Sequence, residues 1–345
     1  MKAAVFYGPL DLKLEERAIP KAGPDEIVVK IGTSGLCPSD VRIYRNGSSA
    51  VRPPVTMGHE FSGSIFQVGQ NVEGFNENDR VNAAADAYCG KCKMCKSGHE
   101  NICEDGMAFG YTVNGCHADY VLIPKRWIAR GGVFPLPSDV DYEEGAMTEP
   151  LACSLNTIET LGARPGKSVV IIGDGPMGLL HVGLAKEYGA SKIILCGLVT
   201  WKLKLGEELG ATHTVNVGRE DIVKTVTAAT NSLGGDIVVV TAVTSQTIPQ
   251  GLQIAAKRGY VSIFGGTPKG LTIQFEPNII HYNETFLTGS SGYTYDHYTK
   301  AAQMVASHKI PLKKLITHRF DLSRIHDAIK TWDDKEKSMK IMLTR

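Results

Sequence analysis

A glycine-rich turn between an apolar run and a helical stretch is the feature that most restricts the fold of this chain. The run Ser168–Ile172 is short and rich in β-branched residues, and the sequence G-D-G-P-M-G follows it at residues 173–178. The stretch Met177–Tyr188 has the apolar spacing of a helix. G-x-G-x-x-G by itself is a weak signal, and a purely structural turn is the alternative. With a strand before it and a helix after it, the pattern predicts a dinucleotide site.

Each glycine of this turn has a physical role in such a site. The first allows the tight turn, the second lets the backbone approach a pyrophosphate, and the third lets helix and strand pack closely. The helix N-terminus adds free N–H groups and the positive end of its dipole. The residues predicted to bind the dinucleotide are Gly173, Gly175, Pro176, Met177, Gly178, Gly197 and Lys202.

Further apolar runs extend the pattern. Lys192–Cys196, Asp236–Val240 and Tyr260–Phe264 are typical of buried parallel strands. They predict an α/β fold with a doubly wound parallel sheet, the Rossmann arrangement, over residues 151–289. Residues 1–150 are rich in Gly and Pro, and short alternating runs there predict a mainly antiparallel β domain. Residues 290–345 return to mixed helix and strand.

The end of the second predicted strand bears on the choice between NAD and NADP. NAD sites usually carry Asp or Glu there to bond the ribose 2′-hydroxyl, whereas this chain has Cys196-Gly197-Leu198. Without that carboxylate a 2′-phosphate is permitted, yet no arginine follows. Lys202 and Lys204 are the nearest cations, and solvated helix charges are their commoner role. The sequence leaves the cofactor open and slightly favours NAD.

Bulk composition excludes several classes of function. The 345 residues are 43% hydrophobic and 21% charged, with a net charge of +1. That balance argues against a nucleic-acid or membrane-surface binder. No apolar run approaches the roughly 20 residues that span a bilayer, and the apolar start MKAAVFY is too short for a signal peptide. A cytoplasmic location is expected.

Four of the eight cysteines crowd into one segment, as Cys89, Cys92, Cys95 and Cys103. Four thiolates at this spacing can converge on one tetrahedral Zn²⁺ with no position left for a substrate. An iron–sulfur cluster is disfavoured because its fourth cysteine usually precedes a proline. A nucleic-acid-binding zinc module is disfavoured by the neutral chain, and disulfides are disfavoured by the expected compartment. The segment predicts a structural zinc site.

The other candidate ligands are dispersed. Cys37 lies in the sequence G-L-C-P-S-D, His59 and Glu60 are adjacent in G-H-E, and Glu149 lies in T-E-P. Cysteine, histidine and carboxylate suit a catalytic zinc that keeps one position open. Each has an ordinary alternative as a core or surface residue, and spacing alone does not join them.

With these residues in view, the chain resembles the medium-chain zinc alcohol and polyol dehydrogenases along its whole length. The resemblance rests on C-P-S-D at 37–40, G-H-E-F-S-G at 58–63, the four-cysteine segment, E-P-L at 149–151 and the turn at 173–178. It implies that Cys37, His59 and either Glu149 or Glu60 hold the catalytic zinc. It also implies that 1–150 and 290–345 form one GroES-like catalytic domain into which the Rossmann domain is inserted.

The resemblance implies a mechanism and an assembly. Zinc lowers the pKa of a secondary alcohol, Ser39 accepts its proton, and a hydride passes to NAD or NADP. At the position of Arg42 many relatives carry a histidine that passes the proton to solvent. Arginine cannot take that role, because it stays protonated. A homodimer or homotetramer is implied, paired through the sheet edge near 260–289.

Substrate identity stays open. A polyol or sugar alcohol, phosphorylated or not, is the first expectation, and E-P-L at 149–151 looks more like the polyol branch than the threonine branch. An L-threonine-type amino alcohol and a non-catalytic dinucleotide-binding regulatory protein are the alternatives. Polar residues that sequence alone does not assign to a pocket are Tyr44, Arg45, Tyr111, Asn114 and Tyr293.

Overall fold

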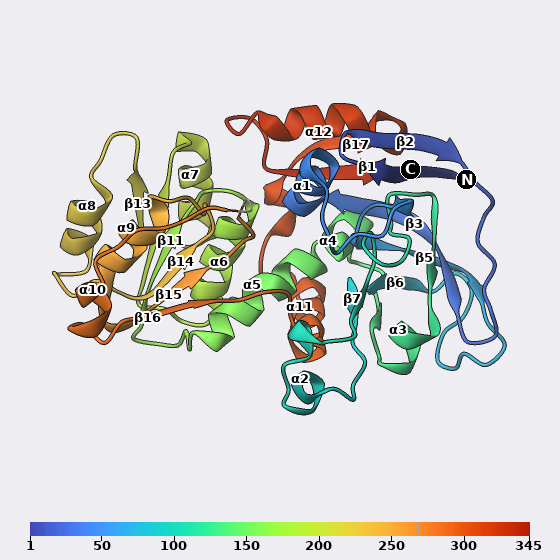
Figure 1. Cartoon of the computed structure of the whole chain (residues 1–345), viewed down its shortest axis with the longest axis horizontal. Coiled ribbons are helices and arrows are strands. Elements are labelled where there is room, and N and C mark those ends of the chain that lie inside the picture. The colour runs from blue at the N-terminus through green and yellow to red at the C-terminus, as the bar shows by residue number, and fades with distance from the viewer. Residues whose placement is uncertain (268–269) are drawn as a thin grey trace. The chain divides into compact units, whose positions relative to one another are not determined.

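The computed structural model describes residues 1–267 and 270–345. The chain divides into two compact units (Figure 1). Unit 1 comprises Met1–Ala152, Tyr293–His308 and Leu312–Arg345. Unit 2 comprises Cys153–Gly292 and Lys309–Pro311.

Unit 2 is built on a six-stranded sheet in which every neighbouring pair is parallel. The strand order is β13-β12-β11-β14-β15-β16, so the direction of winding reverses beside β11. The strands are β11 (Ser168–Ile172), β12 (Lys192–Gly197), β13 (His213–Asn216), β14 (Gly235–Val240), β15 (Ala255–Ile263) and β16 (Phe286–Gly289). The predicted doubly wound sheet is confirmed, and in folds of this kind ligands bind where the winding reverses.

The helices of unit 2 connect these strands. They are α6 (Pro176–Glu187), α7 (Thr200–Leu209), α8 (Ile222–Ala229), α9 (Thr247–Ile254) and α10 (Asn278–His281). All five side chains of β11 are buried, as expected for a central strand covered on both faces.

Unit 1 is mainly antiparallel β structure. Its larger sheet has the order β10-β6-β5-β3-β18-β17, with β9 also paired to β3. The pair β17–β18 is parallel, and the other pairs of this sheet are antiparallel. These strands are β3 (Ile27–Leu36), β5 (Glu60–Val68), β6 (Arg80–Ala83), β9 (Tyr120–Ile123), β10 (Val133–Pro135), β17 (Ile316–Asp321) and β18 (Lys340–Thr344).

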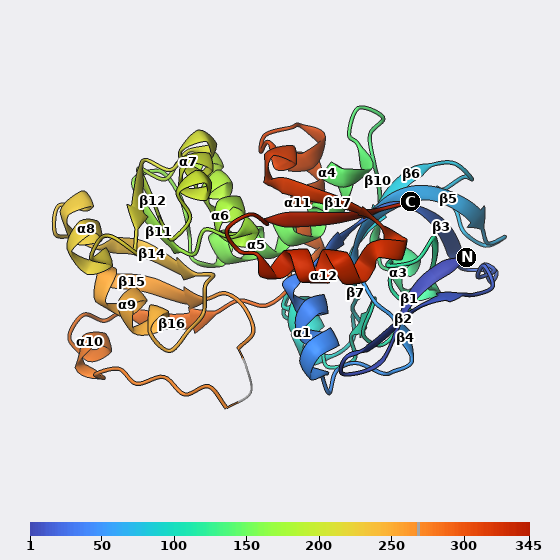
Figure 2. The same cartoon turned by 90° about the horizontal axis from the view of Figure 1, so that it is seen from above.

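Smaller elements complete unit 1, and helix α12 packs against β17 and β18 (Figure 2). The remaining strands are β1 (Lys2–Gly8), β2 (Asp11–Glu16), β4 (Val55–Thr56), β7 (Asp86–Ala87) and β8 (Met107–Ala108). The helices are α1 (Pro38–Asn46), α2 (Lys93–Lys96), α3 (Lys125–Ala129), α4 (Tyr142–Ala146), α5 (Thr148–Thr160, which continues into unit 2), α11 (Tyr295–Ala306) and α12 (Ile325–Asp333), with 3₁₀ turns η1 (Glu100–Ile102), η2 (Leu312–Leu315) and η3 (Leu322–Arg324). Among the described residues, none of the helices is long and apolar enough to cross a membrane.

Candidate metal and cofactor sites

The four clustered thiols converge on one point. The Sγ atoms of Cys89, Cys92, Cys95 and Cys103 all lie within 4.8 Å of one another. The Cys89–Cys95 and Cys92–Cys103 sulfur separations are both 3.9 Å. Four sulfurs bound about 2.3 Å from a tetrahedral zinc lie about 3.8 Å apart, so the cluster has the dimensions of a closed zinc site. A disulfide requires a sulfur separation of about 2.05 Å, and all four cysteines are free.

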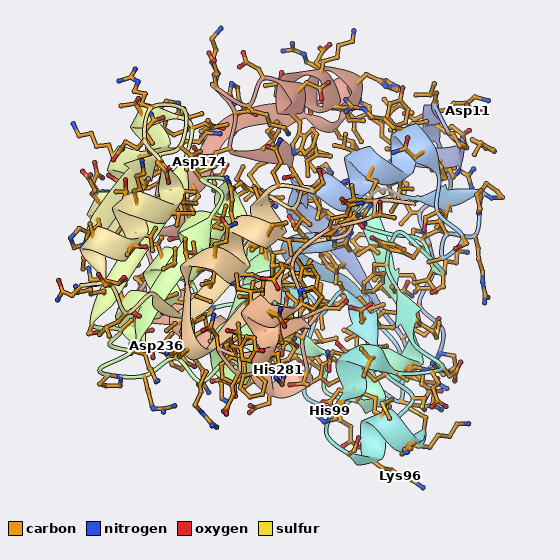
Figure 3. The ribbon with its side chains drawn as sticks, turned by 60° about the vertical axis from the view of Figure 1, so that its left-hand side comes forward. Asp11, Lys96, His99, Asp174, Asp236 and His281 are labelled. Atoms are coloured by element: carbon orange, nitrogen blue, oxygen red, sulfur yellow. The ribbon has the colours of Figure 1, made fainter. Side chains whose placement is uncertain are left out.

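Backbone hydrogen bonds favour the ionised form of two of these thiols, Cys89 and Cys92, whereas burial raises the pKa of Cys95 and Cys103. The N–H groups of Lys91 and Cys92 donate to Cys89 Sγ at 3.5 and 3.3 Å, and these bonds lower the pKa of Cys89 to about 6. Neither α2 nor η1, which carry this segment, contains a buried residue. Lys96 and His99, in the middle of this segment, lie at a protruding tip (Figure 3). With so little apolar packing, a bound metal fits as its main stabilising element.

The pairing of β3 with β5 brings a second set of ligands together. Gly35 of β3 pairs with Glu60, the first residue of β5. Cys37 lies two residues beyond this pair and His59 one residue before it, so both side chains reach the same point. One ligand atom from each of Cys37, His59 and Glu60 lies within 4.8 Å of the others. A side chain at Gly35 would overlap the Glu60 carboxylate, so glycine is required for this close approach.

Asp40 lies behind His59 and orients its ring. Asp40 Oδ1 lies 3.5 Å from His59 Nδ1, and Oδ2 lies 3.4 Å from His117 Nε2. The backbone N–H of Cys37 donates to Oδ2 at 3.0 Å. Because Nδ1 of His59 faces Asp40, Nε2 is left for a metal, as in the carboxylate–histidine–zinc arrangement. Neither Asp40 nor His117 was predicted as a site residue.

The electrostatics of this cluster suit a cation. Burial raises the pKa of Asp40, but the positive charges of His59 and His117 and the backbone N–H of Cys37 together outweigh burial and bring it to about 2. Burial lowers the pKa of His59, but the negative charges of Asp40 and Cys37 hold it well above its ordinary value. A site that attracts a proton onto a buried imidazole also attracts a divalent cation in its place, so the donors present fit zinc.

Lys340 of β18 fixes Glu60 in a buried ion pair. The two side chains are 4% and 2% exposed. Burial lowers the pKa of Lys340, but the negative charges of Glu60 and Cys37 and the hydrogen bond to Glu60 together hold that pKa above its ordinary value. Lys340 therefore stays an ammonium that orients the Glu60 carboxylate. The sequence predicted only mixed helix and strand for residues 290–345 and no site residue there.

Glu149 is buried near this cluster but is not one of its three converging ligands. It is the second residue of α5, which begins at Thr148. Burial raises the pKa of Glu149 to about 7, the negative charge of Glu60 adds to the rise, and the positive charge of His59 opposes it. The structure thus brings Glu60 to the other ligands and leaves Glu149 as a second carboxyl in the same electrostatic environment.

Ser39 and Tyr111 lie beside the cluster, whereas Arg42 is exposed on α1. The Ser39 hydroxyl is buried, and the Tyr111 ring centroid lies 5.9 Å from that of His59. Burial raises the pKa of Tyr111, while the positive charge of His59 opposes the rise. These contacts assign Tyr111, which the sequence left open, to the surroundings of the metal ligands.

The other polar residues that the sequence left open have structural partners elsewhere in unit 1. Tyr44 packs on an apolar core cluster, and Arg45 forms an ion pair with Asp333. Asn114 accepts a backbone N–H through its side-chain oxygen. Tyr293 is fully buried and accepts the backbone N–H of Ala85 at 2.7 Å.

The glycine-rich turn of unit 2 has the geometry of a phosphate cradle. Gly173 has φ +125°, which favours glycine, and a Cβ at Gly178 would overlap the Gly173 carbonyl oxygen. Helix α6 begins at Pro176, and its N-cap residue Gly175 has no capping side chain. The first N–H groups of α6 can therefore bind an anion. Lys202, which the sequence predicted as a cofactor-binding residue, is buried, with only 3% of its surface exposed.

Comparisons with known proteins agree with this arrangement. Residues 23–137 match the model of the alcohol dehydrogenase GroES-like domain, and residues 176–307 match that of zinc-binding dehydrogenases. Sorbitol dehydrogenase of Bacillus subtilis (strain 168) is 30% identical, over 99% of this chain and 97% of its own length. An L-threonine 3-dehydrogenase of Caldanaerobacter subterraneus is 32% identical, over 95% of this chain and 91% of its own length.

Solved structures give the same result. Galactitol-1-phosphate dehydrogenase from Escherichia coli is 27% identical with a TM-score of 0.90, and the match covers 100% of each chain. A Sinorhizobium meliloti 1021 structure bound to NADP is 31% identical with a TM-score of 0.92, and the match covers 100% of this chain and 99% of that one. The chain belongs to the zinc-dependent medium-chain alcohol and polyol dehydrogenases, and it is an oxidoreductase that uses zinc and NAD(P).

Proposed function

We propose that the chain oxidises a secondary hydroxyl of a polyol to a ketone, with unit 1 as the catalytic domain and unit 2 as the cofactor domain. The convergence of Cys37, His59 and Glu60 carries the proposal. Three protein ligands that leave a fourth position open are typical of catalytic zinc, whereas the four-cysteine cluster is closed. The products are the ketone, the reduced nicotinamide and one proton.

Each residue around the open cluster of Cys37, His59 and Glu60 has a separate role. Zinc bound there lowers the pKa of a coordinated hydroxyl, as it lowers that of water from about 15.7 to about 7. Asp40 fixes the orientation of His59 through Nδ1, and Lys340 holds the Glu60 carboxylate. Ser39 accepts the substrate proton, with Tyr111 beside it. Glu149, which is buried in the same electrostatic environment, would be a second carboxylate able to hold the metal.

The cofactor is held by the glycine-rich turn of unit 2. The uncapped first turn of α6 supplies N–H donors for the pyrophosphate. Gly173 and Gly178 keep strand and helix close enough for this approach. The nicotinamide supplies the hydride chemistry, and the protein supplies position and electrostatics.

Surface charges support a polyol over a polyol phosphate. A phosphate substrate requires a cationic pocket, but Arg42 and Arg52 are exposed and Arg45 is paired with Asp333. Two hydroxyl groups near the cluster, the buried one of Ser39 and that of the half-buried Tyr111, suit a substrate with several hydroxyls.

An amino alcohol is the second candidate substrate, and Asp86 of β7 is the observation that favours it. Burial raises the pKa of Asp86 to about 6, and the positive charge of His59 opposes the rise. Asp86 is therefore mostly ionised at neutral pH and can pair with an ammonium group beside the metal ligands.

A turnover screen tests both candidates. We expect purified protein to reduce NAD or NADP with polyols such as sorbitol, measured as absorbance of the reduced nicotinamide, and to lose this activity after incubation with a chelator. Faster turnover of threonine than of any polyol would establish the amino-alcohol function instead. Absence of turnover on polyols, polyol phosphates, amino alcohols and simple secondary alcohols by a protein that binds zinc and dinucleotide would contradict the enzyme function.

We also propose that the chain assembles as a homodimer or homotetramer through the edge strand β16. This strand is the last in the sheet order, and an unpaired edge is available to a second chain. Tyr260 and Phe286 stack there with ring centroids 4.7 Å apart and are 37% and 44% exposed. Light scattering should give a mass of two or four chains, and Phe286→Lys should shift it toward one. A monomeric wild-type protein would contradict the proposal.

A further inference from the structure

Asp174, inside the glycine-rich turn, reaches the end of the neighbouring strand β12. Its Oδ2 accepts the backbone N–H groups of Leu198 and Val199 at 2.8 and 2.7 Å. The side chain lies directly over Gly197, where an added Cβ would come within 2.6 Å of the carboxylate carbon. Two strong backbone hydrogen bonds therefore fix a carboxylate at the carboxyl end of β12.

This position matters because the cofactor ribose binds there in doubly wound folds. An acidic residue at the end of the second strand normally bonds the ribose 2′-hydroxyl, and an arginine accommodates a 2′-phosphate. In this chain the strand end is Gly197, which carries no side chain. The carboxylate comes from the turn between β11 and α6 instead, and it reaches the same place. No hydrogen bond to Asp174 Oδ1 occurs within residues 1–267 and 270–345, so this oxygen can accept a ribose hydroxyl.

The surroundings of Asp174 offer little to a 2′-phosphate. The N–H groups of Leu198 and Val199, which could bind phosphate oxygens, already donate to the carboxylate. The Lys202 side chain is buried and lies over the Trp201 ring, 5.5 Å from its centroid. A phosphate placed beside Asp174 would meet a like charge, and such a juxtaposition disfavours binding.

We propose that Asp174 is a specificity-determining residue that selects NAD over NADP. This inference rests on the proposed function, because it requires the dinucleotide to bind at the glycine-rich turn. Structures of this same fold are bound to NADP in one case and to NADH in another, so the fold by itself does not determine the cofactor. Asp174 supplies the acidic group that the end of β12 lacks.

The test compares ligands that differ only in the 2′-phosphate. Adenosine 5′-monophosphate and adenosine 2′,5′-bisphosphate are titrated calorimetrically into the wild-type protein and Asp174→Asn, and kcat/KM is measured with NAD and NADP. We expect wild-type protein to favour the ligands without the 2′-phosphate by at least about tenfold. Asp174→Asn keeps the shape of the side chain and removes its charge, so the preference should fall by about tenfold.

Two controls keep the result interpretable. Asp236→Asn makes the same change at the opposite end of unit 2 (Figure 3) and should leave the preference unchanged. In wild-type protein the preference should narrow as salt rises, since salt screens like charges; this measurement requires no variant.

Three outcomes overturn the inference. A wild-type preference for NADP does so, and so does an unchanged preference in folded Asp174→Asn. A preference that is independent of salt also contradicts a charge-based selection. If wild-type protein binds neither dinucleotide nor either adenosine ligand, the proposed cofactor site itself is wrong, which is a different result from NADP selection.

Discussion

Cys37→Ala should abolish alcohol oxidation while the protein still binds dinucleotide. Cys37 is one of three converging ligands, and its removal leaves two protein ligands for a catalytic zinc that normally has three. Bound metal should fall from two zinc ions per chain to one, and kcat/KM should fall by at least about 10³-fold. Activity, metal analysis and calorimetric titration of the dinucleotide measure the three quantities.

The matched control for this variant is Cys153→Ala. Cys153 is a half-buried cysteine of α5 outside both clusters, so its loss should change neither zinc content nor turnover. If Cys37→Ala retains two zinc ions and more than a tenth of wild-type turnover, Cys37 is not a catalytic ligand. If it also loses dinucleotide binding, the variant has disturbed more than the metal cluster.

The fold of unit 2 could be predicted because its elements are locally encoded. Each central strand is an apolar run bounded by turn residues, and Ser168–Ile172 coincides with β11. The G-D-G-P-M-G turn identifies the strand from which the winding starts. Edge strands such as β13, with the mixed sequence His213–Asn216, lack this pattern because only part of each is buried.

The metal cluster of unit 1 could be predicted only in part. Cys37 and His59 become neighbours through the antiparallel register of β3 with β5, and no short-range pattern in the sequence determines this pairing. The family resemblance replaced that missing information. A glycine at position 35 is compatible with many turns, and only the Glu60 carboxylate beside it explains its presence.

Residues that support the ligands were missed because their contacts are distant in sequence. Lys340 and Glu60 are separated by 280 positions. Strand β18, which pairs with β3, follows the whole Rossmann unit in the sequence. His117 lies in the sequence G-C-H-A-D-Y. Its ring packs beside Gly58 and faces the Asp40 carboxylate. A buried histidine has no pattern of its own, so only the assembled structure identifies such positions.

Cys103→Ala should unfold the four-cysteine segment and lower the stability of unit 1 while the catalytic cluster keeps its metal. The remaining three thiols leave an incomplete tetrahedral site, and α2 and η1 have no buried residue to hold the segment without metal. Loss of a structural zinc costs several kcal/mol. At about 2–4 °C per kcal/mol for a unit of this size, Tm should fall by about 10 °C. Scanning calorimetry measures this change, and metal analysis should give one zinc ion per chain.

The segment offers its own control in Ser97→Ala. Ser97 is exposed at the end of α2, where its hydroxyl donates to the Met94 carbonyl at 3.0 Å, so its loss should change Tm by less than about 2 °C. Cys103→Ala should retain wild-type turnover at temperatures below its own transition, because the open cluster is formed by other strands of unit 1. A variant with two zinc ions and unchanged Tm would show that these thiols hold no structural metal. Iron with visible absorbance in the wild-type protein would assign the cysteines to an iron–sulfur cluster instead. If Cys103→Ala loses turnover even below its own thermal transition, the two metal clusters are structurally coupled, contrary to the separate roles assigned to them.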